Sequence, residues 1–201
     1  MLTMRRGFTL VEILVSVALF TIVMVVALGA LLALSTAMRK AETINSSVEN
    51  LSAAVESMSR TIRTGLNYDC GLASVSSDPA PVNCTNGATA IALYAVDGSK
   101  VSYCLGTAAG VCSSSGTSIL RNVNSNGVST GWVPLTSPEI KITTLRFYVE
   151  GACSAGGIGG CVPDTVQPRV TMLVSGSVMV TANQSSEFHL QSAITQRLYD
   201  Q

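Results

Sequence analysis

Residues 7 to 12 read Gly-Phe-Thr-Leu-Val-Glu, and they join a short basic leader to a long apolar run. The leader carries Arg5 and Arg6, whereas Glu12 is the one charged residue between Phe8 and Met38. A carboxylate inside a membrane-length apolar helix is energetically costly unless it finds a partner, so such residues usually mark function. Glu12 is therefore a candidate functional residue.

The apolar run has the length of a membrane span. Ile13 to Leu34 is 22 residues, and about 20 apolar residues cross a hydrocarbon core of about 30 Å. The two arginines predict that the N-terminus stays in the cytoplasm and that the rest of the chain is exported. We therefore expect a single-pass protein of the inner (cytoplasmic) membrane with its C-terminal part outside the cytoplasm.

Together these residues resemble the N-terminal signal of type IV prepilins and type II secretion pseudopilins. The resemblance implies that a prepilin peptidase removes the leader, residues 1–7, by cutting between Gly7 and Phe8. It also implies N-methylation of Phe8 and an assembly role for Glu12, which would pair with the new amine of a neighbouring subunit. The implied partners are other pilin or pseudopilin subunits, the peptidase/methyltransferase and, indirectly, an assembly ATPase and a platform membrane protein. The implied destination is an extracytoplasmic filament.

Two simpler interpretations compete with the prepilin signal. An ordinary secretory signal could be cut near Ala33-Leu34-Ser35, but its apolar core is usually only about 7–15 residues long. A plain membrane anchor would also tolerate Glu12, because a carboxylate is favourable near a helix N-terminus. Neither interpretation requires the combination of glycine, phenylalanine and glutamate at these positions, so the prepilin signal is favoured.

The helix is expected to continue beyond the membrane. No proline interrupts residues 8–64, and Gly65 is a good terminator. In residues 39–65 apolar side chains recur every three or four positions, which predicts an amphipathic helix. This stripe consists of Ile44, Val48, Leu51, Val55, Met58 and Ile62. We therefore predict one helix over 8–65, in which 8–38 form the membrane span or filament core and 39–65 pack on a C-terminal head.

Six cysteines lie in residues 66–201, an even number that predicts disulfides in an exported domain. Their order suggests three local pairs, although 15 pairings are possible: Cys70 with Cys84, Cys104 with Cys112, and Cys153 with Cys161. A metal site is the alternative. It is disfavoured because the chain has a single histidine, His189, and no Cys-x-x-Cys pair.

The head is expected to be rich in β-structure. Residues 66–90 contain many Ser, Asn, Gly and Pro, and they predict an irregular disulfide-tied loop. Asp97-Gly98 is a strong hairpin-turn signal. Strands are predicted at 90–96, 100–105, 118–123, 132–135, 140–150, 169–180 and 186–197, with one slip in the alternation of 140–150. Glycines between Cys153 and Cys161 predict a flexible tip. Together these strands predict one antiparallel sheet.

Composition argues against several functions. Loss of Arg5 and Arg6 leaves ten basic against twelve acidic side chains, a balance that disfavours nucleic-acid binding. Asn122, Asn124 and Asn126 mimic the start of a calcium loop but lack its carboxylates. Trp132 is a candidate sugar platform or, more simply, a core or edge anchor. We find no set of residues for catalysis and predict neither an enzyme nor a cofactor.

The sequence thus predicts an α+β, pilin-like protein in which a long N-terminal helix packs on an antiparallel β head. The segments Gln-Pro-Arg-Val (167–170), Phe-His-Leu-Gln (188–191) and Gln-Arg (196–197) loosely resemble the end of J-type minor pseudopilins and minor pilins. We expect a structural subunit, minor rather than major, of a type IV pilus or a type II secretion pseudopilus. The alternative is a tip adhesin whose head recognises a surface, a sugar or DNA.

Overall fold

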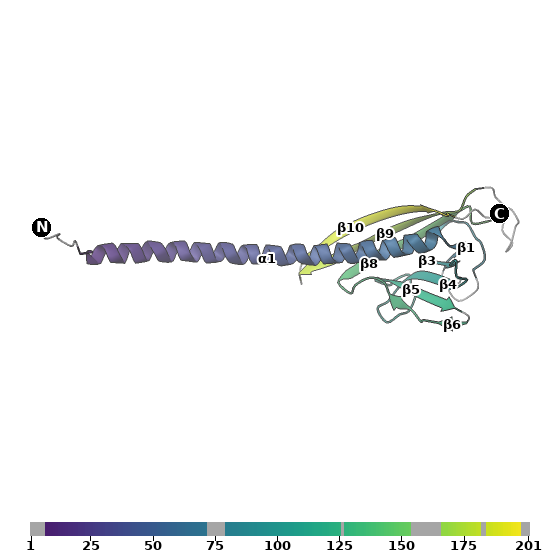
Figure 1. Cartoon of the computed structure of the whole chain (residues 1–201), viewed down its shortest axis with the longest axis horizontal. Coiled ribbons are helices and arrows are strands. Elements are labelled where there is room, and N and C mark those ends of the chain that lie inside the picture. The colour runs from purple at the N-terminus through teal and green to yellow at the C-terminus, as the bar shows by residue number, and fades with distance from the viewer. Residues whose placement is uncertain (1–6, 72–78, 126, 154–165, 182–183, 198–201) are drawn as a thin grey trace. The chain divides into compact units, whose positions relative to one another are not determined.

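The fold was analysed in a computed structural model that describes residues 7–71, 79–125, 127–153, 166–181 and 184–197. Within these residues one helix, α1 (Leu10–Arg63), precedes ten strands. Figure 1 shows α1 and most of the strands that follow it. The strands are β1 (Leu66–Cys70), β2 (Cys84–Ala88), β3 (Ala90–Tyr94), β4 (Lys100–Gly106), β5 (Ser118–Ser125), β6 (Val128–Ser129), β7 (Val133–Pro134), β8 (Ile140–Glu150), β9 (Arg169–Thr181) and β10 (Gln184–Thr195). The predicted α+β class is confirmed.

The chain divides into two compact units, Met1–Thr43 and Ile44–Gln201. The first unit contains the apolar first part of α1. The second unit contains the amphipathic part of α1 together with all ten strands, and we call it the head unit. The end of α1 thus belongs to the same compact unit as the strands that follow it.

The strands form two antiparallel sheets, so the prediction of a single sheet is wrong. One sheet has the order β1-β3-β4-β5-β6, with β7 also pairing β5, and the other has the order β10-β9-β8-β2. The sheets meet where the amide of Ile142 in β8 donates to the carbonyl of Thr117, just before β5, at 2.9 Å. Turn signals mark where strands end, but they do not say which sheet a strand joins.

The prediction of an irregular loop over 66–90 is also wrong in part, because this stretch contributes β1 and β2. Their sequences, Leu-Asn-Tyr-Asp-Cys and Cys-Thr-Asn-Gly-Ala, are poor strand formers by propensity. Pairing with β3 and with β8 overrides that preference. Each of the two strands lies at the end of its own sheet.

The hairpin and the slipped strand agree with the sequence. The turn between β3 and β4 contains Asp97 and Gly98, and Gly98 has the positive φ of 78° that glycine tolerates best. In β8 the register with β9 shifts between Ile142 and Thr144. This bulge at Thr143 is the physical cause of the slip in the apolar alternation.

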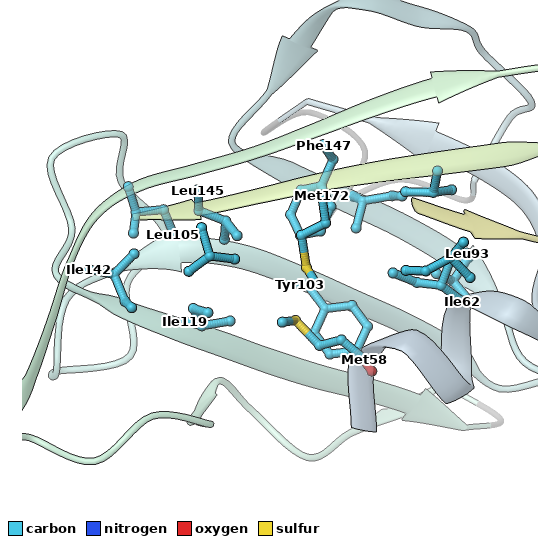
Figure 2. Packing of buried hydrophobic residues seen from close by; sticks show 14 of the residues in the cluster. Met58, Ile62, Leu93, Tyr103, Leu105, Ile119, Ile142, Leu145, Phe147 and Met172 are labelled. Atoms are coloured by element: carbon cyan, nitrogen blue, oxygen red, sulfur yellow. The ribbon is translucent and has the colours of Figure 1, made fainter. Parts of the chain in front are cut away.

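A large core lies in the head unit, and α1 and both sheets contribute to it. Met58 and Ile62 of α1 pack with residues of both sheets (Figure 2). From one sheet come Leu93, Tyr103, Leu105 and Ile119, and from the other Ile142, Leu145, Phe147 and Met172. In Figure 1, β9 and β10 lie on one side of this part of α1 and β3 and β4 on the other. The helix is therefore an integral layer of the head.

The buried face of α1 differs slightly from the predicted stripe. It consists of Ser47, Leu51, Ala54, Met58 and Ile62. Val48 is 51% exposed and therefore lies outside it. Ser47 and Ala54 are buried on this face although neither belongs to the predicted stripe of large apolar side chains.

The end of α1 is held by polar contacts from β1 and from the residue that follows β10. The Tyr68 hydroxyl lies 2.7 Å from the carbonyl oxygen of Ile62 and 2.8 Å from that of Gly65. Gln196, which follows β10, donates its side-chain amide to Gly65 at 2.8 Å. These bonds satisfy carbonyls that a helix end leaves without helical partners. A Cβ at Gly65 would overlap Leu93, so close packing also requires glycine here.

Candidate functional site

The predicted cleavage point lies just before the helix. Gly7, Phe8 and Thr9 have no regular secondary structure, and α1 begins at Leu10. The Phe8 side chain is 77% exposed, and a Cβ built on Gly7 meets nothing within 4 Å. A peptide bond in an uncrowded segment without regular secondary structure can enter a peptidase active site without prior unwinding of the helix. The bond between Gly7 and Phe8 meets that condition.

Thr9 is a residue that the motif analysis did not single out, and it caps the helix. Its side-chain oxygen accepts a hydrogen bond from the amide of Glu12 at 3.3 Å, and its carbonyl accepts one from Ile13 at 3.3 Å. Thr9-Leu10-Val11-Glu12 has the Thr-x-x-Glu spacing of a capping box, the signal that would have located it. The cap lies one residue after Phe8 and fixes the start of α1 at Leu10.

Glu12 lies in the first turn of α1, where the helix dipole favours a negative charge. Its side chain is exposed, and within the described residues no hydrogen bond or ion pair engages its carboxylate. The structure therefore brings Gly7, Phe8 and Glu12 into one short segment with the acid unpaired. A carboxylate so placed can accept a cationic partner from another molecule.

The segment that follows presents apolar side chains all round. Every residue from Leu10 to Met38 is exposed in the isolated chain. The hydroxyls that interrupt the segment donate to backbone carbonyls of the same helix, Ser16 to Ile13 at 2.9 Å and Thr21 to Ala18 at 2.8 Å. The helix also runs through Gly29 without a break. In the described part of the chain α1 alone is long and apolar enough to cross a membrane.

Comparison with protein families identifies this segment. Residues 2–28 match the family model of the prokaryotic N-terminal methylation motif. The chain carries a type IV prepilin-like signal. Searches of curated proteins and of solved structures find no match. The loose resemblance of the last strands to J-type subunits therefore stays a prediction, while the prepilin-like signal and the pilin-like architecture are both present.

The head of this prepilin-like chain contains the predicted cysteine pairs as far as its residues are described. Cys70 is joined to Cys84, and Cys104 to Cys112, with Cα–Cα distances of 6.5 and 5.8 Å. The first disulfide links β1 at the end of one sheet to β2 at the end of the other. Cys153 is also disulfide-bonded, whereas Cys161 and the predicted glycine tip lie outside the described residues.

The remaining candidates occupy positions with structural explanations. Nδ1 of His189 lies 3.0 Å from the Ser175 hydroxyl, on the exposed surface between β10 and β9. Trp132 is half-buried and packs against a small cluster that includes Cys104 and Cys112. Asn122 exchanges hydrogen bonds with Ser129 across the β5–β6 hairpin, while Asn126 lies outside the described residues. No group of three metal-ligating side chains occurs among the residues described.

Proposed function

We propose that this chain is a structural subunit, minor rather than major, of a type IV pilus or a type II secretion pseudopilus. The observation that carries the proposal is the methylation motif at residues 2–28. The apolar helix that continues from it and the disulfide-bearing β head agree with such a role. The minor class rests on the loose likeness of the last strands to J-type subunits.

The proposed maturation begins in the inner membrane, with the N-terminus in the cytoplasm and the head outside. A prepilin peptidase cuts after Gly7 and methylates the new N-terminus at Phe8. The protonated amine pairs with the Glu12 carboxylate of a neighbouring subunit, so that both charges are neutralised inside an apolar bundle, where an unpaired ion is costly. An assembly ATPase and a platform protein, acting indirectly, would then move subunits from the bilayer into the filament.

Mass spectrometry of the native protein tests the processing step. The mature chain should begin at N-methylated Phe8. A mature form that begins at any other residue would overturn the proposal, because the amine that pairs with Glu12 would then be absent or displaced.

Substitution of Glu12 tests the assembly step. We expect Glu12→Ala to leave cleavage largely intact and to reduce incorporation into filaments, measured by immunoblots of sheared filaments. Glu42→Ala is the matched control, since Glu42 is an exposed acid of the same helix beyond the apolar run. Normal incorporation of Glu12→Ala would contradict charge pairing.

We propose no catalytic activity for the chain. The rival function is a tip adhesin, in which the head binds a surface, a sugar or DNA and the helix serves only as its mount. A chimera that joins residues 1–43 to a different pilin head distinguishes the two. Filaments restored by the chimera favour the structural role, and neighbouring genes for a retraction ATPase or an outer-membrane channel would separate pilus from pseudopilus.

A further inference from the structure

The head unit contains a pocket of about 350 Å³, lined by both charged and apolar side chains, that the filament function does not use. The last turns of α1 provide one wall through Arg60, Thr61 and Thr64. The turn between β3 and β4 contributes Asp97 and Ser99 to the lining, and β5 contributes Arg121. All of these side chains belong to the head unit.

Arg121 is the unusual member of this pocket. Its Nε atom is buried without a hydrogen bond of good geometry, although the Tyr103 hydroxyl is a polar neighbour of the side chain, and the guanidinium forms no ion pair within the described part of the chain. A cation that is partly removed from water without a counter-ion is unfavourable, and an anion that reaches it recovers a charge-assisted hydrogen bond. The pocket beside Arg121 gives such an anion space to enter.

The other pocket residues set the charge of that anion. Arg60 lies at the mouth, where its side chain is 79% exposed and 3.4 Å from Glu56. Asp97 accepts hydrogen bonds from the Ser99 amide at 3.0 Å and from the Ser99 hydroxyl at 2.6 Å. These bonds lower the pKa of Asp97, so its charge persists at neutral pH. Because Arg60 is already paired with Glu56, Arg121 is the pocket cation without an acidic partner among the described residues. A single such cation near Asp97 favours a singly charged ligand over a dianion such as hydrogen phosphate.

We propose that this pocket binds one carboxylate group, held by the Arg121 guanidinium, with Arg60 at its mouth. Planar carboxylates suit guanidinium because two parallel hydrogen bonds can form. The hydroxyls of Thr61 and Thr64 already donate to helix carbonyls, at 3.0 and 3.2 Å. They therefore shape the wall, and the arginines provide the attraction. The carboxylate is either a side chain of a second copy or a small soluble acid.

Acetate titration of the full chain in detergent micelles tests the site by NMR. Backbone amide signals of Thr61 and Val123, which line the pocket, should shift saturably with sodium acetate. Sodium chloride at the same ionic strength should not reproduce the saturation, and phosphate should bind more weakly. Shifts that are linear in acetate and equal in chloride would overturn the proposal.

Variants assign the effect to the pocket. Arg121→Gln should weaken acetate binding by about tenfold or more, as loss of a charged hydrogen bond predicts. Asp97→Asn should strengthen binding, because it removes the opposing negative charge from an exposed position. Arg146→Gln is the matched control, since Arg146 is an exposed arginine of β8 in the other sheet. Unchanged acetate affinity in Arg121→Gln would exclude Arg121 as the ligand.

Self-association of the full chain in micelles distinguishes the two sources of the carboxylate. If a second copy supplies it, both acetate and Arg121→Gln should weaken self-association in sedimentation experiments. If the ligand is a soluble acid, both should leave self-association unchanged while acetate still binds. Either result supports the carboxylate site, and only the absence of saturable, Arg121-dependent binding contradicts it.

Discussion

Two fully buried tyrosines, Tyr68 and Tyr103, differ in the bonding of their hydroxyls. Tyr68 contacts the carbonyls of Ile62 and Gly65 at the end of α1. The Tyr103 hydroxyl is buried without a hydrogen bond of good geometry, and its polar neighbours are Thr61 and Arg121. A satisfied buried hydroxyl stabilises the fold, whereas an unsatisfied one costs desolvation energy.

We expect Tyr68→Phe to lower the free energy of unfolding by about 1 kcal/mol and Tyr103→Phe to leave it unchanged or raise it slightly. Chemical denaturation of the full chain in micelles, followed by circular dichroism, measures both. Tyr148→Phe, at a half-buried tyrosine of β8, is the control for loss of a hydroxyl. Equal destabilisation by Tyr68→Phe and Tyr103→Phe would contradict this assignment.

The pH dependence of stability provides a second readout for Tyr103. Burial raises the pKa of its hydroxyl above the ordinary value of 10.0. The unfolded chain therefore loses this proton at a lower pH than the folded chain. The contribution is fully present below pH 10 and is lost as the pH rises toward the folded pKa. Tyr103→Phe should remove that part of the alkaline loss of stability.

At the scale of elements, two substitutions in the amphipathic part of α1 test which face of the helix is buried. Met58 is 0% exposed, whereas Val48, which the apolar periodicity places on the same stripe, is 51% exposed. Met58→Ala should reduce the free energy of unfolding by about 2–5 kcal/mol, because it leaves a cavity between the helix and both sheets. Val48→Ala should change it by less than about 0.5 kcal/mol. Comparable losses in the two variants, measured by denaturation in micelles, would favour the sequence stripe over the observed face.

The same elements show what the sequence can and cannot predict. The methylation segment, the long helix and the β3–β4 hairpin were predictable, because each depends on residues close together in the chain. β1 and β2 were not, since Asn67, Asn86 and Gly87 suit turns and become strand residues only through pairing with distant partners. For the same reason the division into two sheets was not predictable. The pocket beside Arg121 was missed because it joins three segments that are far apart in sequence.

At the scale of the whole molecule, the division into two compact units sets the smallest fragment that should fold. The sequence placed the head at residues 66–201, but the second unit begins at Ile44. Removal of residues 44–65 would delete Leu51, Met58 and Ile62 from the core and expose the apolar side chains they cover. The helix end also supplies the carbonyls that Tyr68 and Gln196 contact.

We therefore expect residues 44–201 to fold in aqueous buffer, with dispersed NMR signals and cooperative thermal unfolding. Residues 66–201 should instead be unfolded or aggregate, because both sheets then lose their common apolar partner. The two fragments contain the same six cysteines, so oxidative conditions act on both alike. Cooperative unfolding of 66–201 at a similar temperature would mean that the sheets form a core without α1. That outcome would mean that the β-sheets form an independent domain to which the helix is only attached. If residues 66–201 do not fold, the last turns of α1 are instead a required layer of the head.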